Sequence, residues 1–319
     1  MIRMRKPRIL TLGAAYTDFV CTVKQLPEPG EEAVSDGEYF FAPGGRGVFY
    51  SVSAARLGAD VVLCACTGKD AYADKLFEAL EKETVDRRFI FRDSEEKTGF
   101  SHILCEEKKP NRVTLFPGAN RCIHEEHLEE AFTCYPDALL LNCEHEPELV
   151  RYALCMAKEQ DIPAFLDLSS GENAPVLPSG CVCQAILLNE QQGELYTGIR
   201  PSTAADALRV AISLASSVKT EYVVIKMNKR GAFVYDGLHH EILSPPEVRP
   251  VDPAGAEDAF SASLALRFLK NGGDIADAVR FANCVSAYTS TQNGAYAAFP
   301  TISDLEAFLR SASPSAASH

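Results

Sequence analysis

The 319-residue sequence has few positive charges: 31 Lys and Arg stand against 44 Asp and Glu, giving a formal net charge of −13. Nucleic-acid and anionic membrane surfaces are bound by basic side chains that neutralise phosphates, so this deficit argues against both partners. No apolar run approaches the ~20 residues of a membrane span. The basic Met1–Arg8 and the apolar Ile9–Ala15 mimic a signal peptide, but the run is short and Asp18 and Lys24 follow too soon. We expect no membrane span and a cytoplasmic location.

Zinc-ligand spacings, internal repeats and low-complexity linkers are also missing from the sequence. None of the seven histidines stands with cysteines at zinc-finger spacing. The eleven cysteines fall mostly in apolar segments such as 64–66 and 181–183, which indicates reduced, buried thiols. Because no linker divides the chain, we expect one domain over residues 1–310, followed by a disordered tail at Ser311–His319.

What the sequence does contain is an alternation of strand-like and helix-like segments, which is typical of an α/β fold with a mainly parallel sheet. Strands are expected at Ile9–Gly13, Val61–Cys66, Ala138–Asn142, Ile162–Leu168, Ala185–Asn189, Tyr222–Lys226 and Ala232–Tyr235. Helices are expected at Ala71–Glu83, Pro147–Gln160, Ala204–Ser216, Asp258–Lys270, Ile275–Thr289 and Asp304–Arg310. Two stretches, Asp18–Ala42 and Thr98–Pro117, break this pattern because they alternate between apolar and polar residues.

The most informative segment is Val251–Leu264, which combines a strand end, a glycine turn and the start of a helix. Apolar residues recur at a spacing of four, at Phe260, Leu264 and Phe268, which predicts a buried stripe. The first turn, Gly255-Ala256-Glu257-Asp258, offers free N–H groups and a positive dipole end that can hold an anion. An aspartate beside such a site suits phosphoryl transfer to an alcohol, although Asp258 could also simply cap the helix.

A second glycine cluster lies in Ala42–Gly58, with the sequence APGGRGVFYSVSAARLG. It predicts a glycine-rich turn followed by a short helix that ends at Gly58, where left-handed geometry is favourable. The two glycine elements lie about two hundred residues apart in the sequence. Together they suggest a cleft with one substrate on each side.

With these motifs the chain resembles the ribokinase (phosphofructokinase-B) family of sugar and nucleoside kinases, from Ile9 to about Leu309. The first family signature is similar to P-G-G-R-G with A-A-R-L-G-A in this chain, and the second is similar to D-P-A-G-A-E-D-A-F. The P-G-A-N run of ribokinases is similar to Phe116–Asn120. The resemblance implies a Rossmann-like α/β/α sandwich with a small β lid from about 16–42 and 97–117. It also implies ATP-dependent phosphorylation of a hydroxyl on a small sugar or nucleoside, with Mg²⁺ and pairing of two subunits through the lid.

The resemblance also assigns an acceptor site. Its candidate residues are Tyr16, Asp18, Gly44, Gly45, Arg46, Phe49 and Glu144. Carboxylates accept charge-assisted hydrogen bonds from sugar hydroxyls, and glycines let backbone amides approach the sugar. Tyr16 and Phe49 stand where ribokinases usually carry asparagine; they either stack on the substrate or fill space. Glu144 is a sugar contact by resemblance and a solvated loop acid otherwise.

On the donor side, the resemblance implies roles in ATP, Mg²⁺ and K⁺ binding. The nucleotide and magnesium residues are Asn189, Gln192, Lys226, Asn228, Gly231 and Asn283, and the monovalent-cation residues are Asp252 and Gly294. Asn189-Glu190-Gln191-Gln192 is similar to the family's N-x-x-E motif, but a neutral amide replaces its acid, which predicts weaker magnesium binding. Asn228 replaces a glycine of the nucleotide turn and tolerates left-handed geometry.

The catalytic residues implied are Asp258 as general base and the backbone of Gly255, Ala256 and Glu257 as anion hole. Glu257 stands where the family has glycine, so its side chain either intrudes on the phosphates or faces solvent, and we expect it to face solvent. An active kinase is the favoured hypothesis. The alternative is a degenerate member that binds a sugar, nucleoside or nucleotide without efficient transfer.

Overall fold

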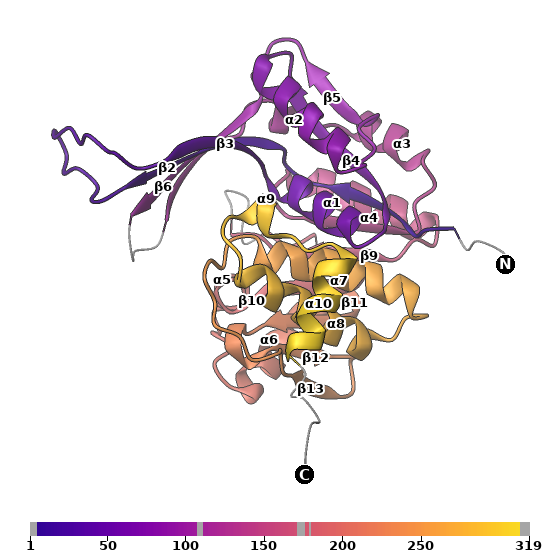
Figure 1. Ribbon diagram of the computed structural model, residues 1–319. Helices are drawn as coiled ribbons and strands as arrows, with labels where there is room; N and C mark the ends of the chain where they lie inside the picture. Colours follow the sequence, from indigo (N-terminus) through magenta and orange to yellow (C-terminus); the bar gives the residue numbers. More distant parts are fainter. Residues whose placement is uncertain (1–4, 107–110, 171–175, 179, 313–319) are drawn as a thin grey trace.

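The computed structural model describes residues 5–106, 111–170, 176–178 and 180–312, and its centre is a nine-stranded sheet (Figure 1). The strands are β1 (Arg8–Leu12), β4 (Asp60–Gly68), β5 (Ile90–Asp93), β8 (Ala138–Asn142), β9 (Ala164–Asp167), β10 (Val182–Asn189), β11 (Lys219–Lys226), β12 (Ala232–Tyr235) and β13 (His240–Leu243). Their order is β13-β12-β11-β10-β9-β8-β1-β4-β5. Only the β11–β12 and β12–β13 pairs of this sheet are antiparallel. The expected mainly parallel α/β sheet is confirmed.

Helices cover both faces of the sheet. One core contains side chains from α1 (Arg46–Arg56), α2 (Ala71–Lys82), α7 (Ala256–Lys270), α8 (Ile275–Ser290) and α10 (Ile302–Ala312). The other contains side chains from α3 (Glu125–Phe132), α4 (Pro147–Glu159) and α6 (Ala204–Ser217), with α5 (Glu190–Thr197) beside it. Ile9 and Leu140 point into the first core, whereas their neighbours Leu10 and Leu139 point into the second. This alternation explains why the strands are continuous apolar runs: both faces of each strand are buried.

A second sheet projects from the body as a lid (Figure 1). Its strands are β2 (Tyr16–Val23), β3 (Tyr39–Gly44), β6 (Gly99–Glu106) and β7 (Arg112–Phe116), in the order β3-β2-β6-β7. The outer pairs are antiparallel, and β2 runs parallel to β6. The alternating segments of the sequence therefore form the expected lid, and β3 extends it to Gly44.

The helix that carries the candidate base, α7, is buried on nearly every side and not only along the predicted stripe. It packs between α1 and α8. Small residues such as Ala259, Ser261 and Ala262 let its neighbours approach closely, and all three are buried. The helix begins after Gly255, whose φ of 76° lies in the left-handed region that favours glycine.

Most expected elements are present, and two of the strands, β8 and β12, have the expected bounds. Several elements were not predicted from the sequence: β5, α3, α5, β13, and the short helices η1 (Gly118–Cys122), η2 (Asn228–Arg230) and α9 (Ala295–Ala298). Of the expected tail, Ser311 lies in α10, and residues 313–319 lie outside the described part.

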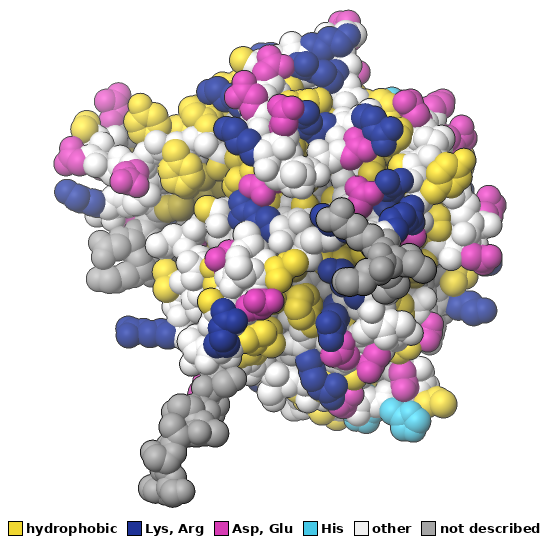
Figure 2. Space-filling view, turned by 45° about the vertical axis from the view of Figure 1, so that its right-hand side comes forward, with side chains coloured by type: hydrophobic (Ala, Val, Ile, Leu, Met, Phe, Trp, Pro, Cys, Tyr) yellow, Lys and Arg dark blue, Asp and Glu magenta, His cyan; other side chains and the backbone are white. Residues whose placement is uncertain are grey.

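The eleven cysteines are free; six are buried, as expected, and five are half-buried. No helix in the described ranges is long and apolar enough to cross a membrane. On the face shown in Figure 2, Lys and Arg side chains are interspersed with Asp and Glu and form no continuous basic patch.

Candidate active site

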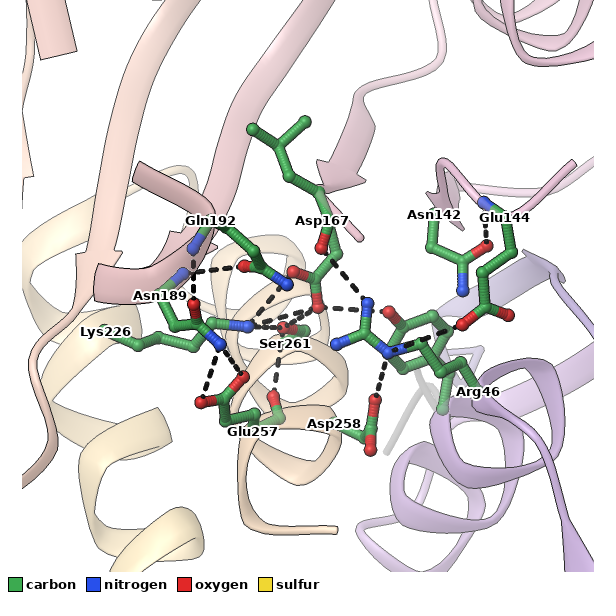
Figure 3. Close-up of polar contacts among 12 residues, drawn as sticks. Arg46, Asn142, Glu144, Asp167, Asn189, Gln192, Lys226, Glu257, Asp258 and Ser261 are labelled. Carbon is green, nitrogen blue, oxygen red and sulfur yellow. Dashed lines mark hydrogen bonds and ion pairs between the residues drawn. The ribbon is translucent and has the colours of Figure 1, made fainter. Parts of the chain in front are cut away.

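The candidate site lies at the carboxyl edge of the central sheet. Strands β8, β9, β10 and β11 end at Asn142, Asp167, Asn189 and Lys226, and all four side chains appear together in Figure 3. The first turns of α1 and α7 face this edge, so Arg46 and Asp258 are brought into the same group. In open α/β sheets, ligands bind at the carboxyl ends of the strands, which is where these polar side chains converge.

Asp258 is 8% exposed and lies in the first turn of α7. Its Oδ1 is 3.2 Å from Nε of Arg46, and that Nε is 4.0 Å from Oε1 of Glu144. Arg46 also donates a hydrogen bond of 3.1 Å to the carbonyl oxygen of Leu168. Burial raises the pKa of Asp258 to about 7, although Arg46 acts in the opposite direction. Burial likewise raises the pKa of Glu144, again opposed by Arg46.

A buried ion pair that was not predicted from the sequence lies behind these groups. Nζ of Lys226 is 3.0 Å from Oδ1 of Asp167, and Oδ2 of the same carboxylate accepts hydrogen bonds from Ser261 (2.6 Å) and Tyr50 (3.0 Å). Burial alone would raise the pKa of Asp167, but the charges of Lys226 and Arg46 outweigh it and lower the pKa. The ammonium group of Lys226, expected at the nucleotide turn, is thus held inside the protein and ties β9, β11 and α7 together.

On the acceptor side, Asp18 lies on lid strand β2 and is 8% exposed. Burial raises its pKa to about 7, and a hydrogen bond with Ser101 acts to lower it. A Cβ added to Gly44 would lie 2.1 Å from the Asp18 carboxylate, and one added to Gly45, where φ is 92°, would lie 2.3 Å from the carbonyl oxygen of Ala14. These two glycines are therefore required for the backbone to approach Asp18 and the end of β1.

The aromatic residues of the acceptor side are packed against the protein. Tyr16 is buried, and the ring of Phe49 makes an edge contact with Phe299 at a centroid distance of 5.6 Å. This contact agrees with the second of the two alternatives for Phe49, that its ring fills space inside the protein. A residue given no role from the sequence, Asn120, accepts a 2.8 Å hydrogen bond from N–H of Ala15 and donates one of 2.9 Å to its carbonyl oxygen. It fixes the loop between β1 and the lid.

On the donor side, the expectation that Glu257 faces solvent is wrong. Nδ2 of Asn189 lies 2.8 and 3.0 Å from the two carboxylate oxygens of Glu257, and Glu257 lines a cavity beside α7. Gln192 is 2% exposed, and its Oε1 accepts a 2.7 Å hydrogen bond from N–H of Asn189. This bond belongs to a capping box that starts α5, so the Gln192 side chain is used inside the protein.

The cavity has a volume of about 990 Å³. Residues that line it include Arg46, Asn228, Lys229, Gly231, Pro245, Val248, Gly255, Glu257, Asp258, Asn283 and Ala287. Asn228 adopts a φ of 51°, which confirms the expected left-handed geometry. Asn283 donates a 2.8 Å hydrogen bond to the carbonyl oxygen of Leu243. The cavity is large enough for a nucleotide.

The two residues suggested for a monovalent cation are close together, because N–H of Gly294 donates a 3.0 Å hydrogen bond to Oδ2 of Asp252. For a divalent cation, the described residues contain no group of three or more His, Cys, Asp or Glu side chains able to hold an ion. Mg²⁺ at phosphoryl-transfer sites is usually held by one or two carboxylates together with phosphate oxygens. The carboxylate of Glu257 on the cavity wall fits that donor set.

A parallel α/β sheet with acids and a helix N-terminus at its carboxyl edge is an arrangement suited to transfer of a phosphoryl group to a hydroxyl. The chain belongs to the family of pfkB carbohydrate kinases, which matches residues 6–302.

Individual relatives are similar over nearly the whole chain. The ribokinase of Haemophilus influenzae is 28% identical over 316 residues, which cover 97% of this chain and all of the relative. The deoxyribokinase of Salmonella typhi is 24% identical, over 94% of this chain and 98% of the relative. The structure of Arabidopsis thaliana ribokinase complexed with ribose and ATP has a TM-score of 0.85 at 21% identity, covering 97% of this chain and all of that one.

Proposed function

We propose that this carbohydrate kinase phosphorylates a hydroxyl of a small, uncharged sugar with ATP as the donor. The observation that carries this proposal is the position of Asp258, which ion-pairs with Arg46 at the acceptor side and lines the donor cavity. Asp18 and Glu144 add two further carboxylates near the acceptor side. Such groups suit neutral hydroxyls and repel anionic substrates. The names of the relatives, ribokinase and deoxyribokinase, support the same substrate class.

Asp258 is the proposed general base. Its pKa of about 7 lies near physiological pH, where a base is most effective at accepting a proton from a hydroxyl. The N–H groups from Gly255 to Asp258, at the positive end of α7, would stabilise the charge on the transferred phosphoryl group. Gly255 is the left-handed residue that lets the chain turn into this cradle. Arg46 is placed to hold the Asp258 carboxylate until the acceptor hydroxyl arrives.

We assign the cavity beside α7 to ATP. Asn228, Gly231 and Asn283 line it together with Glu257 and Asp258. Mg²⁺, when bound with the nucleotide, would neutralise phosphate charge beside the first turn of α7. Asp252 and Gly294 are the proposed monovalent-cation residues, because they meet directly behind that turn.

The test is a coupled assay of ADP release by the purified protein with ATP, Mg²⁺ and a panel of ribose, deoxyribose, fructose, gluconate and adenosine. We expect a neutral sugar to give the highest kcat/KM, and the Asp258→Asn variant to lose it. A non-catalytic binding protein would show ligand binding in titration calorimetry but no turnover with any compound. Preference for gluconate would contradict the proposed neutral acceptor.

We also propose a homodimer formed through the lid. On the lid face that carries Asp18, Val20 pairs with Phe40 and Ile103, and Ile103 pairs with Val113. Val113 is 54% exposed and Leu115, on the same face, is 53% exposed. Apolar side chains exposed next to the unpaired edges of β3 and β7 are expected to be covered by a partner. Sedimentation should give a dimer for the natural protein and a monomer for Val113→Lys/Leu115→Lys; a monomer for both contradicts the proposal.

We further propose a reducing, cytoplasmic location. All eleven cysteines are free, and disulfides are rare where glutathione and thioredoxin keep thiols reduced. Fractionation of the source cells with a specific antibody is the direct check.

A further inference from the structure

The carboxylate of Glu257 is fixed in position by one neighbouring amide. Nδ2 of Asn189 lies 2.8 Å from one oxygen and 3.0 Å from the other, and the side chain belongs to the wall of the donor cavity (Figure 3). The orientation of this amide is determined by its other contact, because Oδ1 of Asn189 accepts a 2.9 Å hydrogen bond from N–H of Gln192. A carboxylate has about four lone-pair positions, so Glu257 keeps acceptor capacity for a cation in the cavity.

Gln192 cannot supply negative charge to the same cavity. It is neutral, it is 2% exposed, and its Oε1 accepts a hydrogen bond from the backbone of Asn189. Asn189 therefore contacts both positions: the uncharged one at the start of α5 and the charged one at the start of α7. Compared with the family motifs, the chain lacks an acid at position 192 and has an additional acid at position 257. The side chain of Asn189 connects these two positions.

A bare carboxylate beside nucleotide phosphates would weaken nucleotide binding, because like charges repel. A divalent cation placed between them reverses the sign of the interaction. Mg²⁺ prefers oxygen ligands and is commonly held by one or two carboxylates plus phosphate oxygens.

We propose that Glu257 ligates the divalent cation that accompanies the nucleotide, directly or through a water, and replaces the acid that position 192 lacks. Asn189 acts as the positioning residue that holds this ligand. The inference rests on the proposed use of ATP, and it assigns the metal-binding acid to α7 instead of α5.

The test measures binding of Mn²⁺, as the metal probe, by electron paramagnetic resonance in the presence of a non-hydrolysable ATP analogue. Glu257→Gln should weaken Mn²⁺ binding about 10–100-fold, the usual effect of disturbing a metal site and its supporting shell. Without metal, the same variant should bind the analogue more tightly, because a repulsive charge is removed. Glu194→Gln is the matched control: Glu194 lies on α5, is exposed and pairs with Arg200, so its loss should leave Mn²⁺ affinity unchanged.

A charge-relocation variant makes the test independent of simple loss of function. In Gln192→Glu/Glu257→Gly the acid moves from α7 to α5, and the capping box with Asn189 is kept because glutamate also serves at its third position. We expect this double variant to recover most of the Mn²⁺ affinity lost in Glu257→Gly alone. Asn189→Ser keeps a helix-capping oxygen but loses the amide that holds Glu257, so it should also weaken Mn²⁺ binding.

Two outcomes overturn the inference. Mn²⁺ affinity in Glu257→Gln equal to or higher than in the natural protein would show that Glu257 only repels phosphates. No recovery in the double variant would show that the charge at 257 does not replace one at 192. Failure of the natural protein to bind the ATP analogue, with or without Mn²⁺, is a separate result that contradicts the proposed donor itself and the inference with it.

Discussion

Replacing Asp258 with asparagine should impair catalysis and stabilise the folded protein, and both effects follow from the burial of this carboxyl group. Burial raises its pKa from 3.8 to about 7. Since one pKa unit corresponds to about 1.36 kcal/mol, keeping this group ionised at pH 8 lowers the free energy of unfolding by about 4 kcal/mol. Asparagine is uncharged and avoids this cost, and the pKa of about 7 already includes the opposing effect of Arg46.

The pH dependence gives the effect its signature. Between pH 3.8 and about 7 the folded protein binds a proton at Asp258 that the unfolded chain has released, so the free energy of unfolding falls as pH rises through this window. The asparagine side chain of the variant binds no such proton. The gain in stability of the variant should therefore be largest at pH 8 and less than half as large at pH 5.

Urea unfolding of the natural protein and of Asp258→Asn at both pH values measures this difference. Turnover of the variant should fall by about 10²–10⁴-fold, the usual contribution of a general base, while ATP binding stays unchanged. In the natural enzyme, kcat/KM should rise with pH through about 7, because only the ionised base accepts a proton. Equal stability differences at pH 5 and pH 8 would refute the buried-charge reasoning, and unchanged turnover would show that another group accepts the proton.

Three further substitutions test other parts of the site. Asp18→Asn should weaken acceptor binding by about 1.5–3 kcal/mol but leave ATP binding unchanged in titration calorimetry; equal losses would contradict its place in the acceptor pocket. Gly255→Ala should lower thermal stability more than Gly272→Ala, since both glycines have φ near 75° but only at Gly255 would a Cβ meet neighbours, at 3.0–3.1 Å. Asp167→Asn should reduce the free energy of unfolding by about 3–5 kcal/mol in urea titration, because it leaves the Lys226 ammonium buried without its partner; a loss below about 1 kcal/mol would argue against this pairing.

The sequence alone was sufficient for the α/β fold and for the lid, because buried strands and lid strands have different patterns. β8 and β12 are uninterrupted apolar runs with turn residues at their ends, so their bounds could be predicted. α3 could not, since it has eight residues and five of them are charged or histidine. The spacing of large apolar residues predicts burial along one stripe of α7 only. Its many alanines and serines are the signal that the helix is buried on nearly every side.

Individual side-chain partners were harder to predict, since each depends on a residue far away in the sequence. The orientation of Glu257 is set by Asn189, which precedes it by 68 residues. Asp167 belongs to no motif, and its only signal is an acid at the end of an apolar strand that was expected to extend to Leu168. Its partner Lys226 lines the donor cavity together with the residues of the nucleotide turn, and the motif gave no sign that its ammonium group also pairs with Asp167.

The lid has a consequence for how the two substrates are coupled. Asp18 lies on lid strand β2 itself, whereas the residues lining the donor cavity, apart from Arg46, come from positions 190 to 290. A displacement of the lid therefore carries an acceptor-binding residue with it and leaves the nucleotide cavity largely intact. Acceptor affinity and lid position are therefore thermodynamically linked. If a molecule that binds the lid changes the affinity for the acceptor by some factor, the acceptor changes the affinity for that molecule by the same factor. The lid is therefore a place where acceptor binding can be regulated independently of ATP.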